Sequence, residues 1–346
     1  MAERNGKYRI LVGSYGSEED EAIQLLEWDA TSKEMRKVKG VNGIDAPSYL
    51  TYDSVKKVCY AISETVDGLV ISYQVGEELV EISRRSTGDN GPCYVSKDSS
   101  GDFLFITNYG GGSLSLHPLD TNGGIKEYSD RISFYHDGAV GKVSHPHICY
   151  PLGDSGIYIV ADLGKDKLYL FELDRINKKL RLINTIDVTK GSGPRHVEYH
   201  EAKSILYVAN EFSSTVSVFR FNEESEELEP IQEINALSAQ QAKVNYSADI
   251  HLSPNGDFLY VSNRGDNVIT SFQVMEDGTL VCSDDTSVLG EWPRNFVITP
   301  DGKFLLVANE HTDNITVFSI DEAGNLYFEN VSYSVYQPTC LCVMNG

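Results

Sequence analysis

The segment WPRNFVITPDGKFLLVANE, residues Trp292–Glu310, is the clearest copy of a pattern that recurs along the chain. It opens at a proline, passes through a short alternating stretch, turns at Asp-Gly and ends in an apolar run. Asp-Gly supplies the positive φ that a tight hairpin requires, and an apolar run is typical of a strand buried on both faces. The segment therefore predicts a β-hairpin whose second strand lies inside a larger β structure.

Six such segments align with one another, and a seventh opening ends the chain. Their anchor positions are 47, 92, 146, 194, 247, 293 and 338, a period of about 48 residues, and proline occupies all of them except Ser247. A period of roughly 40–50 residues with four strands per repeat is typical of β-propellers. We therefore predict an all-β fold, a seven-bladed β-propeller with four-stranded blades.

The last repeat is incomplete, and the N-terminal residues contain what it lacks. Residues 337–346 supply one innermost strand, whereas residues 1–45 contain three strand-like runs. Pairing the C-terminal strand with the N-terminal strands would remove two open sheet edges. We predict a closing blade made from residues 1–45 plus 337–346, within a single propeller domain that spans residues 1–346.

Composition narrows the partners of the protein. A formal net charge of -22 argues against nucleic acid and anionic membranes, which both select basic surfaces. No secretory signal or apolar stretch of membrane-spanning length is visible. The six cysteines show neither CxxC nor metal-finger spacing, so we expect free buried thiols and a cytoplasmic location. Whether the chain forms a homo-oligomer stays open.

The first strand of each repeat should be innermost and antiparallel to the second. The start of the first strand and the end of the second then meet at one end of the axis, which we call the mouth. The residues after the seven anchors are Ser48, Cys93, His147, Arg195, Ala248, Arg294 and Thr339. The second strands end at Ser14-Tyr15, Ser63-Glu64, Asn108-Tyr109, Asp162-Leu163, Asn210-Glu211, Asn263-Arg264 and Asn309-Glu310. Longer connections around Phe134–Ser144 and Ala236–Asn245 should rim the mouth.

Arginines gather at the predicted mouth of this acidic protein. Their planar forks bind carboxylate or phosphate oxygens in pairs, so Arg195, Arg264 and Arg294 predict a site for a small anion. Two interpretations without a ligand stay open. The Arg–Glu residues could form an ion-pair network between blades, and the recurring asparagines could cap the turn after the second strand. On the first strand of the segment that opens near Pro194, we expect His196 and His200 to be core residues.

Several segments together resemble a known family. They are HPHICYP, VADLGKDKLYLFEL, GPRHVEYH, LYVANEFSSTV, FLYVSNRGDNVITSF and WPRNFVITPDGKFLLVAN. Over nearly its full length the chain is similar to the lactonase-type seven-bladed β-propellers. That family includes the propeller-type bacterial 6-phosphogluconolactonases and the fungal carboxy-cis,cis-muconate cyclases. Cyclase members carry a His, two Arg and a Glu in the central cleft, and these positions fall on His147, Arg195, Arg264 and Glu211.

The resemblance implies a hydrolase that opens a sugar lactone, with 6-phosphogluconolactone of the pentose phosphate pathway as the expected substrate. We expect no cofactor, and no metal because the sequence shows no His cluster at metal-ligand spacing. Such a reaction needs a water nucleophile, a general base and stabilisation of an oxyanion. The candidate catalytic residues are His147, Arg195, Glu211 and Arg264, and either Glu211 or His147 could be the base. The candidate substrate-binding residues are Arg294, Asn263, Glu310 and Asp162.

Three alternatives stay open at this point. A lactonising enzyme like the muconate cyclases could use the same residues for addition across a double bond. A non-catalytic propeller could use one face as a binding scaffold. Finally, the carboxylates of Asp162 and Glu310 could bind a cation at the mouth.

Overall fold

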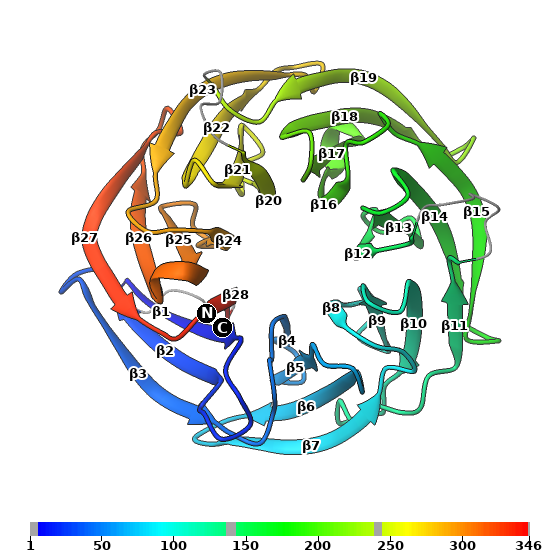
Figure 1. Ribbon diagram of the computed structural model, residues 1–346, viewed down its shortest axis with the longest axis horizontal. Helices are drawn as coiled ribbons and strands as arrows, with labels where there is room; N and C mark the ends of the chain where they lie inside the picture. Colours follow the sequence, from blue (N-terminus) through cyan, green and yellow to red (C-terminus); the bar gives the residue numbers. More distant parts are fainter. Residues whose placement is uncertain (1–5, 136–142, 239–243, 345–346) are drawn as a thin grey trace.

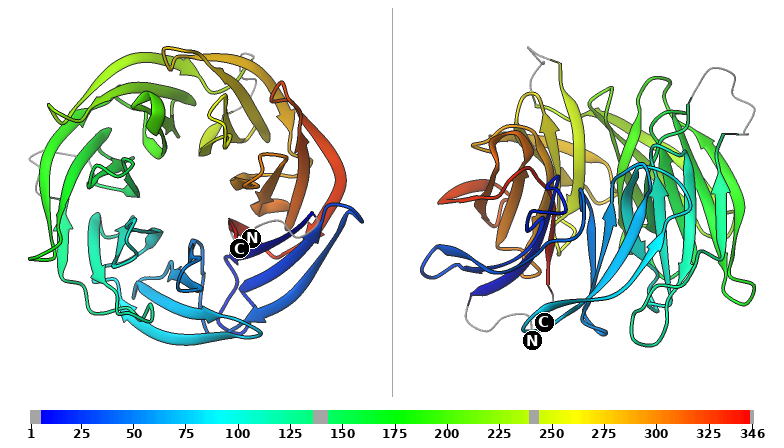
Figure 2. Two further views of the ribbon diagram at one scale, coloured as in Figure 1. Left: turned by 180° about the vertical axis from the view of Figure 1, so that it is seen from behind. Right: turned by 60° about the horizontal axis from the view of Figure 1, so that its bottom comes forward.

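Seven four-stranded antiparallel sheets surround a central axis in the computed structural model, which describes residues 6–135, 143–238 and 244–344 (Figures 1 and 2). The prediction of an all-β, seven-bladed propeller is confirmed. The helical elements of the described part are two short 3-10 turns, Glu201–Lys203 and Glu310–Thr312. No helix in these ranges is long and apolar enough to cross a membrane.

Each blade begins with an innermost strand beside the axis, and its later strands lie progressively further out. The first two complete blades are β4 (Leu50–Asp53), β5 (Val58–Ser63), β6 (Leu69–Val75), β7 (Leu79–Ser86), and β8 (Pro92–Lys97), β9 (Phe103–Asn108), β10 (Ser113–Pro118), β11 (Asp130–Ser133). The next two are β12 (Pro146–Pro151), β13 (Ile157–Asp162), β14 (Lys167–Asp174), β15 (Lys179–Asp187), and β16 (Pro194–His200), β17 (Ile205–Asn210), β18 (Thr215–Asn222), β19 (Glu227–Asn235). The last two are β20 (Tyr246–Leu252), β21 (Phe258–Arg264), β22 (Val268–Val274), β23 (Leu280–Ser287), and β24 (Pro293–Ile298), β25 (Phe304–Asn309), β26 (Asn314–Ile320), β27 (Leu326–Ser334).

The closing blade joins the two ends of the chain, as predicted. Its strands are β28 (Pro338–Val343), β1 (Lys7–Ser14), β2 (Ile23–Asp29) and β3 (Glu34–Val41). β28 runs antiparallel to β1, with Leu11 opposite Cys342 and Val12 opposite Leu341. The last strand of the chain thereby completes the ring beside the first (Figure 1).

The core lies between neighbouring blades. Every residue of β5, β9, β13 and β17 is buried, whereas outer strands such as β15 are largely exposed. Each large apolar side chain buried there contributes about 1.5–3 kcal/mol. Phe105 and Tyr158, for example, stack across two blades with ring centroids 4.1 Å apart. All six cysteines are unpaired, and all are buried except Cys282 and Cys342, which are partly exposed.

Several inner strands share a β-bulge at the residue that follows the anchor position. In β16, Pro194 pairs with Asn210 and His196 with Ala209, so Arg195 is the extra residue of a β-bulge. The residues that follow the anchors in β8, β12, β24 and β28 are skipped in the same way: Cys93, His147, Arg294 and Thr339. Bulges redirect side chains and are frequent beside active sites. The bulge explains how Cys93, His147, Arg195, Arg294 and Thr339 come to line the cavities at the mouth.

Candidate active site

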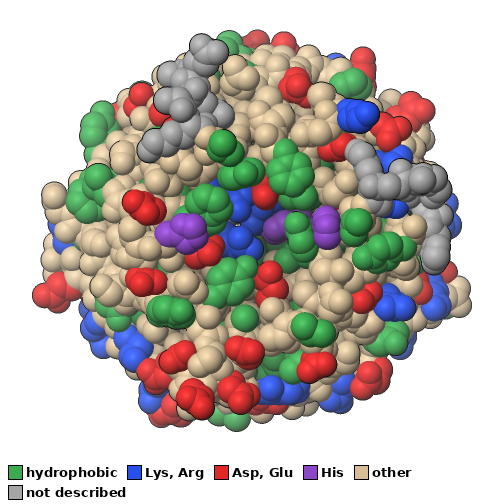
Figure 3. All heavy atoms as spheres, in the orientation of Figure 1, with side chains coloured by type: hydrophobic (Ala, Val, Ile, Leu, Met, Phe, Trp, Pro, Cys, Tyr) green, Lys and Arg blue, Asp and Glu red, His purple; other side chains and the backbone are tan. Residues whose placement is uncertain are grey.

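The mouth encloses a cavity of about 260 Å³. It is lined by Tyr15, Glu64, Cys93, Tyr109, His147, Glu211, Arg264 and Arg294. Seen from this side, basic side chains lie at the bottom of a central hollow ringed by hydrophobic and histidine side chains (Figure 3). Of the four predicted catalytic residues, His147, Glu211 and Arg264 line the cavity, and Arg195 lines a narrower space beneath it.

Glu211 is held by two arginines, Arg195 of its own blade and Arg264 of the next blade. It follows β17, and its Oε2 lies 3.0 Å from Arg195 Nε and 2.8 Å from Arg264 Nη2. Burial opposes ionisation of this carboxyl, but Arg264 and Arg195 outweigh it and lower the pKa of Glu211. The side chain is therefore a carboxylate at neutral pH, fixed in position by its two cationic partners.

The same two arginines are anchored to the backbone of β20. Arg195 Nη1 donates to the carbonyl of Ala248 at 2.7 Å, and Arg264 Nη2 donates to the carbonyl of Ser247 at 3.1 Å. Burial and the neighbouring arginines lower the pKa of Arg195 to about 10, so the group stays cationic at neutral pH. Each guanidinium thus has a defined orientation.

Arg294 occupies the other side of the cavity. Its guanidinium carbon lies 5.3 Å from the centre of the Tyr15 ring, a cation–π arrangement. Its Nε lies 3.8 Å from Glu310 Oε2, longer than a hydrogen bond. Tyr15 in turn donates its hydroxyl to Glu64 Oε2 at 3.1 Å. Burial disfavours the cation, but Tyr15, Glu64 and Glu310 outweigh it and raise the pKa of Arg294.

His147 contributes a neutral imidazole to the cavity wall. Burial and then Arg195 hold the pKa of His147 well below its ordinary value of 6.5. Its ring meets those of Tyr109 and His196 edge-on, at centroid distances of 5.8 and 5.0 Å. Its Nδ1 is buried without a hydrogen-bond partner in the described part of the protein. A neutral imidazole beside a carboxylate and cationic guanidinia can accept a proton from a polarised water.

Two predicted substrate-binding residues have structural partners instead, and we withdraw both from the proposed site. Asp162 lies outside the cavity, where it accepts hydrogen bonds from Ser144 Oγ at 2.6 Å and from the backbone N–H of His145 at 2.8 Å and of Lys165 at 3.1 Å. Asn263 is fully buried and donates to the Ala236 carbonyl at 2.8 Å. The hydrogen bonds of both side chains stabilise the ends of their own blades.

The recurring asparagines have a structural role, as one interpretation of the sequence predicted, but they do not cap the turn after the second strand. Asn210 Nδ2 donates to Thr215 Oγ1 at 3.0 Å and to Ser217 Oγ at 2.8 Å, and Asn108 bonds the hydroxyls of Ser113 and Ser115 in the same way. These partners lie on the third strand of the blade. The asparagines therefore tie the second strand to the third beyond the turn between them.

Glu310 lies at the edge of the site. Besides its contact with Arg294, its Oε1 is 3.7 Å from His311 Nε2. In the described ranges, no group of three or more His, Cys, Asp or Glu side chains is arranged to hold a metal ion. The long connections predicted at the rim fall partly on residues 136–142 and 239–243, which lie outside the described residues.

Four residues of the cavity were missed as site residues by sequence reasoning: Tyr15, Glu64, Cys93 and Tyr109. Cys93 occupies the bulge position after its anchor. The other three occupy the place that Glu211 has in its blade, directly after the second strand. Their position in the repeat had placed all four at the predicted mouth, but they were not named as candidate catalytic or binding residues. Of the two expected core histidines, His196 is buried, whereas the prediction is wrong for His200, which is partly exposed at the end of β16.

Comparison with known proteins connects this geometry to a family. Residues 9–343 match the family described as "Lactonase, 7-bladed beta-propeller". The chain is 30% identical over 299 residues to the 6-phosphogluconolactonase of Bacillus subtilis, covering 84% of this chain and 85% of that protein. It is 32% identical over 305 residues to the 6-phosphogluconolactonase of Formosa agariphila, covering 84% and 86%.

Solved structures show the same likeness across the whole fold. The periplasmic gluconolactonase of Pseudomonas aeruginosa superposes with a TM-score of 0.90 at 28% sequence identity, covering 97% of this chain and 99% of that one. With the matched residues spanning nearly the entire propeller, the chain belongs to the lactonase family of seven-bladed β-propellers.

Proposed function

We propose that this protein hydrolyses a sugar δ-lactone at the mouth, and that 6-phosphogluconolactone is its substrate. The observation that carries the proposal is the meeting of His147, Glu211, Arg264 and Arg294 around one cavity of about 260 Å³. The names of the relatives from Bacillus subtilis and Formosa agariphila support the substrate class.

Substrate binding follows from the arrangement of the arginines. Arg264 already binds Glu211 and the Ser247 carbonyl. These contacts fix the orientation of its guanidinium, including the N–H groups that remain free. Arg294 has no carboxylate oxygen within hydrogen-bond distance among the described residues. Its guanidinium can therefore donate two parallel hydrogen bonds to the oxygens of a phosphate group. We assign the phosphate to Arg294 and the lactone carbonyl to Arg264.

Hydrolysis requires a water molecule to attack the lactone carbonyl carbon. A base takes one proton from this water as the new C–O bond forms, and negative charge develops on the carbonyl oxygen. The ring C–O bond then breaks, and the departing alkoxide receives a proton, which gives the open hydroxy acid. Arg264 stabilises the oxyanion because its charge is already fixed in place before the reaction begins.

Two groups of the cavity are in their basic forms at neutral pH. Glu211 is ionised because two arginines lower its pKa, and His147 is neutral because burial and Arg195 lower its pKa. Glu211 is the more constrained, since Arg195 and Arg264 both occupy its Oε2. A substrate anion at Arg294 would partly cancel the positive field on His147, which would raise its basicity when substrate is bound.

The test is hydrolysis by the purified protein of freshly prepared 6-phosphogluconolactone, corrected for spontaneous ring opening. Unphosphorylated gluconolactone and a muconolactone serve as comparison substrates. We expect acceleration of both sugar lactones, with the higher kcat/KM for the phosphorylated one. Reaction of the muconolactone alone would favour a cyclase-like activity, and no acceleration of any lactone would overturn the proposal.

A further inference from the structure

We propose that a polar chain along the propeller axis prepares His147 as the general base. The chain runs from His147 through one buried water to His196, Asp249 and His251, and it ends at the opposite face. We call it the axial relay. The inference rests on the proposed function, because it concerns the base of the same reaction, and it assigns positioning roles to His196, Asp249 and His251.

Asp249 is the centre of the axial relay. Its side chain is 1% exposed, yet its carboxylate accepts hydrogen bonds from side chains of its own strand, β20, and of the two neighbouring inner strands, β16 and β24. Oδ1 accepts from His196 Nδ1 at 2.7 Å, and Oδ2 accepts from His251 Nε2 at 3.1 Å and from Asn295 Nδ2 at 2.5 Å. Burial opposes its charge, but His251 and the hydrogen bonds outweigh it and hold the pKa of Asp249 well below its ordinary value.

The carboxylate determines the tautomer of His196. An ionised carboxylate can only accept hydrogen bonds, so the hydrogen of neutral His196 must lie on Nδ1. Burial and then Arg195 lower the pKa of His196 from 6.5 to about 4, which keeps the ring neutral. Its Nε2 therefore carries a lone pair. That atom is buried and has no hydrogen-bond partner among the described residues.

A cavity of about 10 Å³ lies between the rings of His196 and His147 and the inner end of β4. Four of the residues that line it carry buried polar atoms without a hydrogen-bond partner in the described ranges: Ser48 Oγ, His147 Nδ1, His196 Nε2 and Arg195 Nε. Of these, Arg195 Nε already lies 3.0 Å from Glu211 Oε2 as an ion pair. This volume suits one water molecule, and a buried water typically makes about three hydrogen bonds. One water at this position would satisfy Ser48 Oγ, His147 Nδ1 and His196 Nε2, each of which would otherwise cost about 1–3 kcal/mol.

The bridging water orients the base. In the proposed arrangement the water donates to the lone pair of His196 Nε2 and to Ser48 Oγ, and its oxygen accepts from His147 Nδ1–H. The hydrogen of neutral His147 is then on Nδ1, and Nε2 carries the lone pair that can take a proton from the attacking water. Once His147 is protonated, the negative charge of Asp249 stabilises the imidazolium through the same hydrogen bonds.

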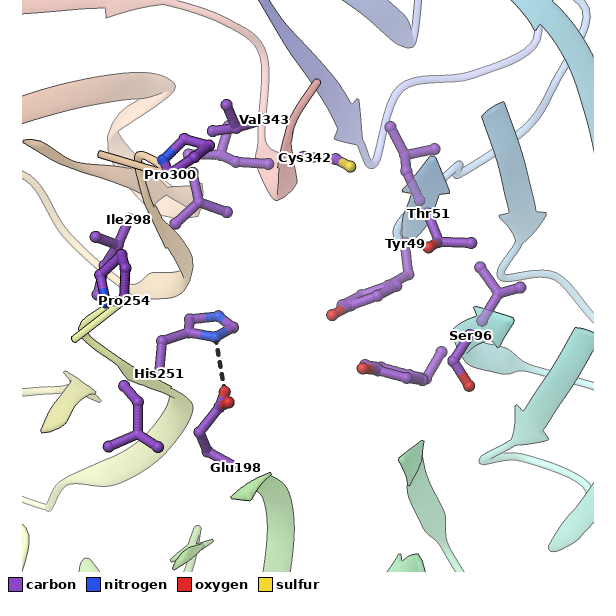
Figure 4. A pocket seen from close by; sticks show the side chains of 16 residues that line it. Tyr49, Thr51, Ser96, Glu198, His251, Pro254, Ile298, Pro300, Cys342 and Val343 are labelled. Carbon is purple, nitrogen blue, oxygen red and sulfur yellow. Dashed lines mark hydrogen bonds and ion pairs between the residues drawn. The ribbon is translucent and has the colours of Figure 1, made fainter. Parts of the chain in front are cut away.

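The far end of the axial relay lies in a second cavity of about 410 Å³ on the opposite face, lined by Tyr49, Tyr94, Glu198 and His251 among others. His251 donates from Nδ1 to Glu198 Oε2 at 3.2 Å, and the two side chains point toward each other in Figure 4. Burial disfavours its cation, but Asp249 and Glu198 outweigh it and raise the pKa of His251 to about 10. This fixed imidazolium keeps Asp249 ionised.

Two variants and a matched control test the axial relay kinetically. Asp249→Asn removes the charge at nearly constant shape, and His196→Phe removes both nitrogens but keeps a ring beside Tyr94. His200→Phe, on the same strand and outside the relay, is the control. With 6-phosphogluconolactone as substrate, we expect kcat to fall on the order of 10²-fold in the first two variants, the lower part of the range for general-base catalysis. KM should stay close to the parent value, and the control should keep the parent kcat. An unchanged kcat in folded His196→Phe would overturn the relay while leaving the proposed function intact.

A spectroscopic measurement tests the relay even if the variants do not fold or the parent proves inactive on lactones. Two-bond proton–nitrogen correlation spectra of the parent with ¹⁵N-labelled histidine distinguish the two neutral tautomers, and His147→Gln assigns the signal. We expect His147 to carry its hydrogen on Nδ1 and an unprotonated Nε2. A His147 that is protonated on Nε2 at neutral pH would overturn the inference, because no lone pair would then face the cavity.

Discussion

The two ends of the propeller axis place histidines in opposite charge states. At the mouth, burial and arginines hold the pKa of His147 below its ordinary value. At the opposite face, Asp249 and Glu198 raise the pKa of His251 to about 10 despite burial. Both residues stand on inner strands, β12 and β20, of equivalent place in the repeat. The difference shows that the neighbours contributed by adjacent blades, and not the repeat itself, determine the chemistry of each end.

Deleting residues 337–346 should have the largest effect, because β28 contributes to both ends. Thr339 lines the narrow cavity near the mouth, and Leu341 and Val343 line the cavity at the opposite face. The deletion also exposes the inner edge of β1. We expect the truncated protein to lose its cooperative unfolding transition, which circular dichroism during heating measures. A truncated protein that melts within a few degrees of the parent would contradict the closure of the ring.

The next largest effect should appear when the base is removed at the mouth alone. Glu211→Gln and His147→Ala each remove one candidate, and the true base should cost on the order of 10²–10⁴-fold in kcat. The axial relay predicts the larger loss for His147→Ala. Steady-state kinetics above the spontaneous rate decide between them, with melting temperatures as the control for folding. Equal rates in both variants and the parent would make the cluster a structural ion-pair network.

A milder effect is expected from Arg195→Lys. The planar fork of Arg195 reaches both Glu211 and the Ala248 carbonyl, and a lysine ammonium cannot keep both contacts in the same geometry. Because Arg195 lies beneath the cavity, we expect loss of order in Glu211 and a fall in kcat/KM of about 10-fold, roughly 1.4 kcal/mol. A loss as large as that of the base variants would instead place Arg195 in direct contact with the reacting atoms.

The smallest effect is a pair of opposite pH dependences of stability. Between pH 6.5 and about 4 the unfolded chain protonates His196 while the folded protein keeps it neutral, so stability falls as the pH falls through this window. The loss in free energy of unfolding caused by His196→Gln should therefore become smaller as the pH falls toward 4.

His251 should behave in the reverse sense. Its folded pKa is raised from 6.5 to about 10, so its stabilisation is complete below pH 6.5 and is lost as the pH rises toward 10. The cost of His251→Gln should shrink toward pH 10. Urea unfolding of both variants and the parent across this range measures the two slopes, and slopes of the same sign would contradict the opposite charge states.

The sequence predicted the ring more completely than the site. The repeat identified the innermost strands, and the incomplete last copy identified the partner of β1, because both follow from counting along the chain. Each second strand ends in a polar residue that is followed in most blades by another polar or aromatic residue, and it is the later position that lines the cavity at the mouth. Asp162 and Asn263 hold the first of these places, and Glu211 and Arg264 hold the second. The two places look alike until the pairing of the strands is known.

The axial relay was beyond reach of the sequence for a different reason. Its hydrogen bonds join residues about one repeat apart, such as His196 with Asp249, and nothing in the local pattern marks them. His196 was predicted to be a core residue, which is correct for its burial. Its proposed role depends on its contact with Asp249 of the adjacent inner strand, and the closed ring is what brings these two strands side by side.

The most direct test of the account compares one change at each end of the axis. Arg264→Gln removes the proposed oxyanion donor at the mouth, and Thr51→Val alters the cavity of the opposite face outside the axial relay. The measurement is the rate of 6-phosphogluconolactone hydrolysis above the spontaneous reaction. We predict a loss on the order of 10²-fold for Arg264→Gln, as for removal of an oxyanion donor, and the parent rate for Thr51→Val. The parent rate in folded Arg264→Gln, or an equal loss in both variants, would contradict a lactonase site at the mouth.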